Sequence, residues 1–428
     1  MHAFGKLNGL AYGLLGLPLA FVALPLYVIL PNHYATTFGV PLATLGAVLL
    51  GARLFDAFID PLLGRLSDRL FAHSIRAVLA FAAAAAVVLA LGFGLLFFPQ
   101  VTSPGALVVW ASVVLMVTYA AYSFLSVAHQ SWGAMLGGNE AERSGLVAWR
   151  EGLGLVGVVL ASIAPVAFGL PWTTAIFFIA LSVGWLAWTR AVQPTPKAVA
   201  LDESDKVTNK AIWQPFKHGN FKRLLLVFML NGIASAVPAT LVLFFIQDRL
   251  QAPASMEPLF LGSYFLTAAL SIPVWLAVVK RMGLAKTWLL GMALSVAVFA
   301  WATQVGAGQT TAFLIITSLS GIALGTDLAV PGALLAGAIQ RNGDSGKAEG
   351  AYFGWWNFAT KLNLALAAGL ALPLLGLFGY APGVRSPEAL QALVIAYCVL
   401  PCVLKLLAST ALYLLIIKPA SQPSKALL

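Results

Sequence analysis

The sequence predicts an all-α membrane protein in which twelve transmembrane helices form two six-helix halves. Of its 428 residues, 60% are hydrophobic and 9% are charged, whereas soluble proteins carry roughly 25% charged residues. The apolar residues form unbroken runs, and twelve helices of about 20 residues would occupy about 240 positions. This composition excludes a water-soluble enzyme. The unbroken runs also argue against an outer-membrane barrel, whose strands alternate apolar and polar residues.

Apolar runs of spanning length occur in two sets of six, and a polar segment separates the sets. The expected spans lie near residues 8–31, 41–64, 76–98, 105–130, 146–169, 172–192, 221–247, 256–279, 285–304, 309–338, 349–377 and 389–417. We therefore expect an N-terminal half over residues 1–192, a cytoplasmic linker over 193–220 and a C-terminal half over 221–428. The first run is long enough to span, so we expect no cleavable signal peptide.

The positions of the basic residues account for the formal net charge of +10. Lys and Arg gather in the linker and in the even-numbered loops, and only Arg249 and Arg385 fall in loops of the opposite side. This asymmetry follows the positive-inside rule. We expect a multi-pass protein of the inner (cytoplasmic) membrane with both termini in the cytoplasm. The lipid bilayer, rather than a nucleic acid, is then its macromolecular environment.

Patterns typical of catalysis or cofactor binding are absent from the sequence. Cys398 and Cys402, its only cysteines, lie one helical turn apart in an apolar stretch, as packing residues do. There is no nucleophile and base pair, no metal-ligand spacing and no phosphate-binding glycine loop. We therefore expect no enzyme activity, no cofactor and no metal site.

The second span carries three charged residues, Arg53, Asp56 and Asp60, at positions i, i+3 and i+7. On a helix these positions fall within roughly 60° of one another. Each charge at mid-depth costs about 2.5 to 3.5 kcal/mol, so the three must face a protein or water-filled interior. Two carboxylates suit a proton or Na⁺, because hard cations take oxygen ligands. We expect Asp56 and Asp60 to bind the cation with Arg53 as charge partner. The alternative is an ion pair that holds helices together.

Further charges lie inside predicted spans, and three of them concern the charge balance of the site. Lys361, in the eleventh span, is too far from either interface to reach water along its own stem, so it requires a carboxylate partner. Asp56 or Asp60 is the expected partner, and a fixed ion pair between the halves is the alternative. Asp327, in the tenth span, is either a proton site or a second partner for Lys361. Lys405, in the twelfth span, has no evident partner.

Polar and aromatic side chains near these charges are expected to bind the solute, because an aromatic ring combines apolar contact with a hydrogen-bonding edge. Helix packing is the alternative for the aromatic residues. The expected solute-binding residues are Tyr119, Tyr122, His129, Arg150, Trp355, Trp356 and Asn357. Asp68 and Arg69, which follow the second span, are expected to form a gating contact.

The stretch from Arg53 to Gly64 has the pattern R-x-x-D-x-x-x-D-P-x-x-G. It resembles the glycoside-pentoside-hexuronide:cation symporters, the melibiose-permease branch of the major facilitator superfamily. Residues 142–150 and 349–361 resemble the starts of the family's fifth and eleventh spans. The resemblance implies the major facilitator fold. It also implies that Asp56 and Asp60 are cation-site carboxylates, that Arg150 contacts sugar and that Lys361 is the family's intramembrane lysine.

Two departures from the family pattern concern the solute. Leu17 to Ala20 lack the acid that engages sugar hydroxyls in melibiose permease, and Ser123 to Ser126 stand where a second aspartate is expected. These departures argue against a galactoside and favour a less polar solute. We expect a monomeric, cation-coupled (H⁺ or Na⁺) symporter of a small organic solute, such as a sugar or glycoside, working by alternating access. The alternatives are a transporter of lysolipids or other amphiphiles, and a transporter-like sensor without solute flux.

Overall fold

The computed structural model describes residues 5–194, 209–380 and 383–421. Half of the expected linker, including Lys197, Asp202 and Lys206, lies outside the described residues. The described part of the chain is helical and contains no strand, which confirms the all-α class. It divides into two compact units, the first formed by residues 1–217 with 336–358 and the second by 218–335 with 359–428.

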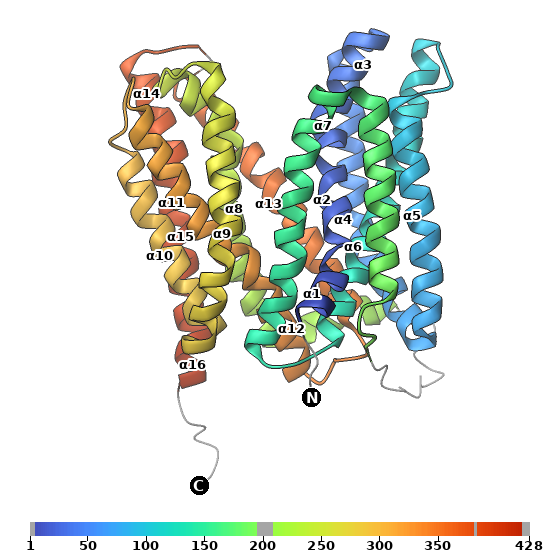
Figure 1. Ribbon diagram of the computed structural model, residues 1–428. Coiled ribbons are helices and arrows are strands. Elements are labelled where there is room, and N and C mark those ends of the chain that lie inside the picture. Colours follow the sequence, from blue (N-terminus) through green and yellow to red (C-terminus); the bar gives the residue numbers. More distant parts are fainter. Residues whose placement is uncertain (1–4, 195–208, 381–382, 422–428) are drawn as a thin grey trace. The chain divides into compact units, whose positions relative to one another are not determined.

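The first unit contains the first six expected spans, drawn from blue to green in Figure 1. Its helices are α1 (Lys6–Gly13), α2 (Gly16–Leu24), η1 (Pro25–Ile29), α3 (Leu30–Phe38), α4 (Leu42–His73), α5 (Ile75–Phe97), α6 (Pro104–Met135), α7 (Glu140–Thr189) and η3 (Asn209–Lys217). Helix α7 contains both the fifth and the sixth expected spans. Gly169 interrupts it with a φ of 78°, a conformation that favours glycine, and Pro165 and Pro171 flank this break.

The remaining helices belong to the second unit, except that α12 and α13 contribute to both, because the division falls after Leu335 and after Phe358. These helices are α8 (Gly219–Phe244), η4 (Phe245–Arg249), η5 (Ala254–Met256), α9 (Glu257–Met282), α10 (Leu284–Ala302), α11 (Thr310–Ala329), α12 (Pro331–Arg341), α13 (Glu349–Leu377), α14 (Pro387–Val394), η6 (Ile395–Val399), α15 (Leu400–Leu412), η7 (Tyr413–Ile417) and α16 (Lys418–Ser421).

Ten helical stretches among the described residues are long and apolar enough to cross a membrane. The two other expected spans are α4 and α13, which have 32 and 29 residues and carry the charges singled out above. Both exceed the about 20 residues that a crossing requires. Each of the twelve expected spans therefore coincides with a helix or with a run of consecutive helical segments.

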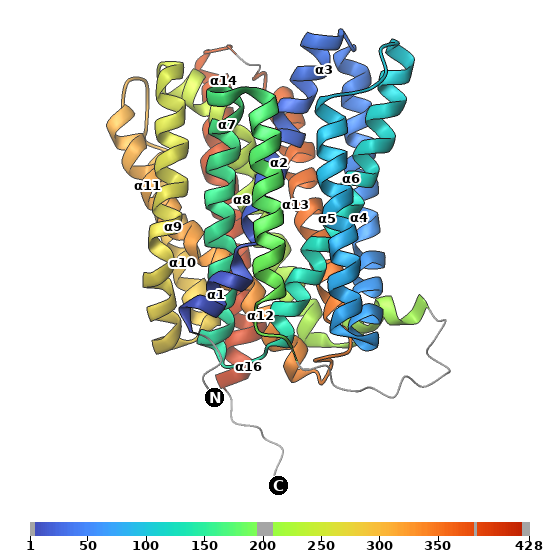
Figure 2. The same cartoon turned by 45° about the vertical axis from the view of Figure 1, so that its right-hand side comes forward.

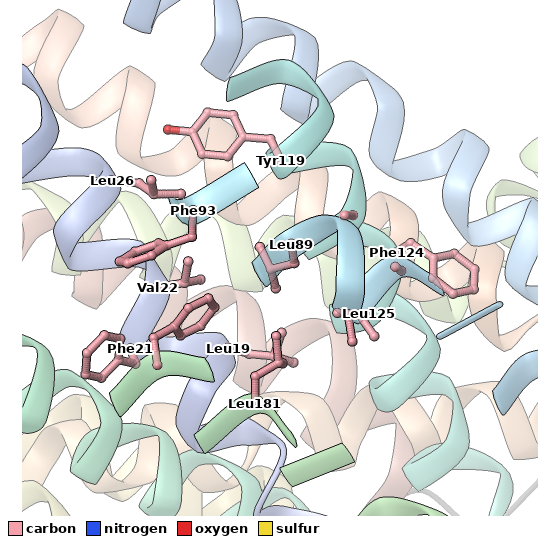
Figure 3. Close-up of a cluster of buried hydrophobic side chains, with 14 of the residues drawn as sticks. Leu19, Phe21, Val22, Leu26, Leu89, Phe93, Tyr119, Phe124, Leu125 and Leu181 are labelled. Atoms are coloured by element: carbon pink, nitrogen blue, oxygen red, sulfur yellow. The ribbon is translucent and has the colours of Figure 1, made fainter. Parts of the chain in front are cut away.

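A cluster of buried hydrophobic side chains holds the first unit together (Figure 3). Phe21 of α2 stacks on Phe177 of α7 with 5.8 Å between ring centroids, and Phe93 of α5 lies 4.6 Å from the same ring. Leu19 and Leu181 pack in the same cluster. These contacts fix α2 beside α7, as Figure 2 also shows.

Small residues allow α2 and α7 to approach closely. A Cβ atom on Gly157 of α7 would lie 2.1 Å from the carbonyl oxygen of Leu17, and one on Gly184 would lie 3.0 Å from Cα of Leu15. Between helices in a membrane, close packing of this kind takes the place of the hydrophobic effect. The α2 and α7 backbones are therefore in direct contact near Arg150.

Residues 336–358 pack with the first unit although they follow it far along the chain. A Cβ atom on Gly350 would lie 2.1 Å from the carbonyl oxygen of Gly64, so α13 begins against the backbone of α4. Arg143 of α7 donates to Oε1 of Gln340 in α12 at 2.7 Å. These contacts explain why this segment belongs to the first compact unit. The two six-helix halves are defined by chain order, and their boundaries stay a prediction.

We predict that Gly157→Ala destabilises the protein by about 1 to 3 kcal/mol, because the added methyl group overpacks the α2 and α7 contact. Gly145→Ala is the matched control in the same helix, since a Cβ there meets nothing within 4 Å. The control is expected to stabilise the helix by about 0.5 to 1 kcal/mol. Thermal unfolding of the purified variants measures both effects, and equal midpoints would contradict the close contact.

Candidate functional site

The charged stripe predicted on the second span lies in the middle of α4. Asp56 and Asp60 are buried, with exposed fractions of 1% and 0%, whereas Arg53 is exposed. Both carboxylates are therefore shielded from lipid by the protein, as the cost of an intramembrane charge requires. The third charge of the stripe remains accessible beside them.

Asp56 has a hydroxyl partner on α6, the helix that packs against α4. Ser123 donates its hydroxyl hydrogen to Oδ1 of Asp56 at 2.6 Å, and both residues are buried. Sequence reasoning noted Ser123 only as a replacement for an expected aspartate. Two residues 67 positions apart give no local signal of contact, so the pair emerges only from the fold.

Aromatic rings surround the exposed end of the stripe. The Arg53 guanidinium lies 4.5 Å from the centroid of the Tyr27 ring, and that ring lies 5.8 Å from the ring of Tyr119. A guanidinium at this distance is attracted by the negative face of the ring. The structure thus brings Tyr119 together with Arg53. Tyr122, nearly one turn along α6, is half-buried.

Arg150 of α7 forms an ion pair with the next residue, Glu151. Its Nε donates to Oε1 of Glu151 at 3.0 Å, and its Nη2 contacts the same oxygen. A Cβ atom on Gly16 of α2 would lie 3.0 Å from Cγ of Arg150, so the arginine is held where α2 begins. Its charge is balanced within its own helix, and contact with a solute stays a prediction.

His129 is fully buried in an aromatic cluster. Its ring lies 4.4 Å from Tyr12 and 5.5 Å from Trp188. The Nε2 atom donates to the Tyr12 carbonyl oxygen at 2.7 Å, and the Tyr12 hydroxyl donates to the His129 carbonyl oxygen at 3.0 Å. These reciprocal bonds favour the packing alternative for His129.

Asp68 joins α4 to the start of α13. Its Oδ1 accepts the Gly350 amide at 2.6 Å and its Oδ2 accepts the Ala351 amide at 2.9 Å. The first amides of a helix lack partners within the helix and carry partial positive charge, so a carboxylate is well suited to them. Asp68 is buried, whereas Arg69 is exposed. The aspartate of the expected gating pair is thus a helix cap.

The aromatic residues expected at the start of α13 differ in their surroundings. Trp355 donates its indole hydrogen to the Ile212 carbonyl oxygen at 2.9 Å, and its ring lies 4.8 Å from the ring of Trp213. It therefore packs on η3. Trp356 is buried and Asn357 is half-buried. Solute contacts of these residues stay a prediction.

Lys361 is half-buried in the part of α13 that belongs to the second unit, whereas Asp56 and Asp60 belong to the first. Its expected pairing with one of these carboxylates stays a prediction.

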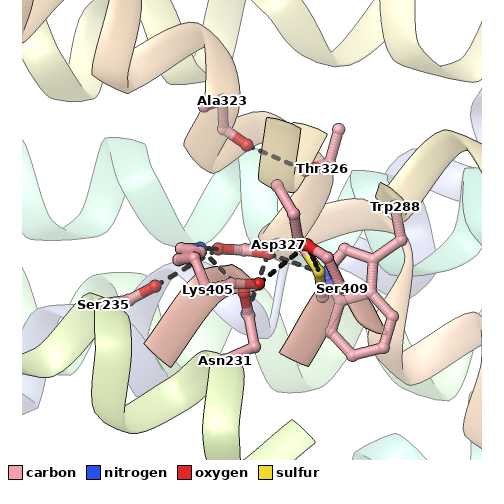
Figure 4. A network of polar contacts seen from close by, with 9 residues as sticks. Asn231, Ser235, Trp288, Ala323, Thr326, Asp327, Lys405 and Ser409 are labelled. Atoms are coloured by element: carbon pink, nitrogen blue, oxygen red, sulfur yellow. Dashed lines mark hydrogen bonds and ion pairs between the residues drawn. The ribbon is translucent and has the colours of Figure 1, made fainter. Parts of the chain in front are cut away.

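A second polar cluster lies in the second unit around Asp327 of α11 (Figure 4). The Nζ atom of Lys405 lies 2.9 Å from Oδ2 of Asp327 and donates to Oδ1 of Asn231 at 2.8 Å. Trp288 and Asn231 donate to Oδ1 of Asp327 at 2.8 and 3.0 Å. Ser235 donates to Oδ2 at 3.4 Å. The cluster connects α8, α10, α11 and α15.

This cluster supplies the partner of Lys405 that the sequence left open. The lysine and Asp327 are 78 positions apart, and both are isolated charges in predicted spans. Their shared isolation inside apolar spans is the sequence signal that could predict this pair, because two opposite buried charges stabilise each other when they are in contact. The predicted roles of Asp327 as a proton site or as a partner of Lys361 stay predictions.

Among the described residues, no group of three or more His, Cys, Asp and Glu side chains is placed to hold a metal ion.

Helices of spanning length that enclose charged and hydrogen-bonding side chains define a multi-pass membrane protein. A solved major facilitator superfamily transporter, FucP in the outward conformation, superposes with a TM-score of 0.69 and 15% identity over 94% of this chain and 98% of FucP. This likeness confirms the major facilitator fold. The family described as MFS/sugar transport protein matches residues 7–418. The chain therefore belongs to this family of transporters.

Two curated relatives agree with this assignment. The uncharacterized symporter YjmB of Bacillus subtilis (strain 168) is 24% identical over 401 residues, covering 86% of this chain and 84% of YjmB. The glucuronide carrier protein homolog of Escherichia coli (strain K12) is 24% identical over 399 residues, covering 88% of this chain and 85% of that protein. They confirm the resemblance to the glycoside-pentoside-hexuronide:cation symporters.

We predict that Asp68→Ala destabilises the protein by about 1 to 3 kcal/mol, because two buried amides at the start of α13 lose their acceptor. Asp68→Asn keeps one acceptor oxygen and is expected to cost less. Thermal unfolding of both variants measures the difference. Equal losses, or no loss for either variant, would contradict a capping role for the carboxylate.

Proposed function

We propose that the protein is a secondary active symporter that couples the uptake of a small organic solute to H⁺ or Na⁺ by alternating access. The observation that carries this proposal is the burial of two carboxylates, Asp56 and Asp60, on one spanning helix. Two acids are costly in such a position. Binding of a monovalent cation there lowers that cost, so the two carboxylates favour cation binding.

The contacts of Asp56 support a cation site in two ways. The Ser123 hydroxyl, 2.6 Å from the carboxylate, is a neutral oxygen that becomes a ligand when its hydrogen turns away. Hard cations such as Na⁺ take ligands of this type. A proton on Asp56 keeps the same hydrogen bond, because a hydroxyl also donates to the carbonyl oxygen of a protonated acid. The site therefore suits either cation.

Coupling follows from differential binding. A cation at Asp56 and Asp60 neutralises negative charge beside Arg53 and thereby changes the electrostatic balance of the α4 stripe. Transport is coupled when cation and solute together favour a conformation that neither favours as strongly alone. The mechanism requires no covalent step.

The family and its relatives favour a sugar or a sugar derivative as the solute. One relative is named as a glucuronide carrier homolog. The missing acids of the first and fourth spans favour a solute with fewer hydroxyl groups to satisfy. A lysolipid or another amphiphile is the second solute class, favoured by the apolar character of the first span.

We further propose that the protein lies in the inner membrane as a monomer with both termini in the cytoplasm. The distribution of Lys and Arg among the loops supports this orientation. The bacterial origin of both curated relatives supports the inner membrane.

The coupling proposal predicts that Asp56→Asn and Asp60→Asn each lower the gradient-driven accumulation of the solute by about tenfold or more. Typical coupling energies correspond to changes of this size. Thermal-shift screening of sugars, glycosides, organic acids and lysolipids identifies the solute. Its uptake is then measured in proteoliposomes under an imposed H⁺ or Na⁺ gradient. Glu388→Gln, an exposed acid on α14, is the control and keeps full accumulation. Unchanged accumulation in the α4 variants would refute the cation site, and absent flux in the unmodified protein would favour the sensor.

We also predict that Ser123→Ala raises the cation concentration for half-maximal uptake by about threefold to tenfold, because one ligand or hydrogen-bond donor of Asp56 is lost. Ser126→Ala is the matched control. Ser126 lies on the same helix and accepts a hydrogen bond from Gln130 at 2.9 Å instead. Equal shifts for the two variants would show that the Asp56 contact has no role in cation binding.

A further inference from the structure

The second unit contains a cavity that the cation site of α4 does not explain. Its volume is about 330 Å³, and α8, α9, α10, α11 and α15 surround it. Small-molecule sites in proteins have volumes of about 300 to 1,000 Å³ and place a few polar groups in an apolar wall. The cavity has the size of such a site.

The wall of the cavity is largely apolar, but it contains one ion pair. Pro238, Phe260 and Phe299 are among the apolar lining residues, and Asp327 and Lys405 line the same cavity. A ligand that fits this wall has an apolar body and one strongly polar group. The chemistry of that group depends on which member of the ion pair retains hydrogen-bonding capacity.

Asp327 has little capacity left. Its two oxygens accept hydrogen bonds from four groups, namely the Trp288 indole, the Asn231 amide, the Ser235 hydroxyl and the Lys405 ammonium. A carboxylate offers about four acceptor positions. A cationic ligand would therefore have to displace a donor that Asp327 already holds.

Lys405 retains capacity. Its ammonium donates to Oδ1 of Asn231 and to Oδ2 of Asp327, and an ammonium has three hydrogens. Among the described contacts, one hydrogen remains for a further acceptor. The side chain is 7% exposed and lines the cavity, so an acceptor in the cavity has access to it.

We propose that this cavity binds an amphipathic carboxylate, with the ligand's carboxylate on the Lys405 ammonium and its apolar part against the aromatic wall. Asp327 holds the ammonium in place. The hydroxyls of Tyr264 and Ser320, which line the same cavity, supply further donors to the ligand. They offset part of the cost of placing a second anion beside Asp327.

This site is separate from the α4 carboxylates, and only its assignment as a solute site rests on the proposed transport function. The binding itself is a property of the second unit. It is therefore testable without any gradient or flux.

The test compares phenyl β-D-glucuronide with phenyl β-D-glucoside. The first probe has a carboxylate where the second has a hydroxymethyl group. Isothermal titration of the full-length protein in lipid nanodiscs measures both dissociation constants. We expect the glucuronide to bind at least about tenfold more tightly than the glucoside, because a hydrogen bond between charged groups contributes about that much to binding.

Removing Lys405 alone leaves a carboxylate without its counter-ion, and such variants often fold poorly. The double variant Lys405→Met with Asp327→Asn removes both charges together and avoids this problem. It is expected to bind the two probes within about threefold of each other, since the ammonium that distinguishes them is gone. Ser318→Ala, an uncharged change on α11 outside the lining of the cavity, keeps the preference.

Two results would overturn the proposal: no preference for the glucuronide in the unmodified protein, or a preference that survives in the double variant. Failure of the transport proposal looks different. If the unmodified protein shows the Lys405-dependent preference but no cation-driven uptake, the cavity assignment stands and the coupling proposal fails. If uptake is cation-driven without the preference, only the cavity assignment fails.

Discussion

The structure depends on how charged groups are accommodated inside apolar helices. A carboxylate or an ammonium at mid-membrane has no water to replace its hydration shell, so it must find donors, acceptors or an opposite charge within the protein. Asp56 finds a serine hydroxyl, and Asp327 finds four donors including an ammonium. The Asp56 contact joins α4 to α6. The contacts of Asp327 join α8, α10, α11 and α15. The polar contacts therefore determine which helices lie together in places where apolar packing alone is unspecific.

The two clusters satisfy this constraint in different ways, and the difference bears on function. Around Asp327 the opposite charges are within one unit, so the cluster is close to neutral without any ligand. In the first unit, Asp56 and Asp60 are two acids on one helix, and Arg53 turns its guanidinium toward the Tyr27 ring. A nearly neutral cluster suits a stable binding surface. A pair of buried acids on one helix suits a site that gains and loses a cation.

The sequence predicted the helical class and the position of every span, because runs of about 20 apolar residues have no other common explanation in a protein. It also predicted the charged stripe, since the spacing of Arg53, Asp56 and Asp60 is local. Contacts between distant residues were not predictable in the same way. The Ser123 and Asp56 bond, the Lys405 and Asp327 pair and the Asp68 cap on α13 each join residues 67 or more positions apart. Helical periodicity indicates which face a residue occupies, but it does not indicate which helix lies opposite.

The contact of Asp68 with α13 shows that a buried carboxylate can also form a contact that is reversible. Its partners are backbone amides at a helix start, and those amides lack a partner within the helix whether or not the carboxylate is present. The contact is buried, but residue 68 follows the end of the expected span at residue 64, so water can replace both bonds once the two helices separate. Separation there exchanges hydrogen bonds with protein for hydrogen bonds with water, which costs far less than separating a buried ion pair. A carboxylate on a helix start near the membrane surface is thus suited to a contact that opens and closes. An ion pair deep inside an expected span, such as that of Asp327 and Lys405, is suited to a contact that stays closed.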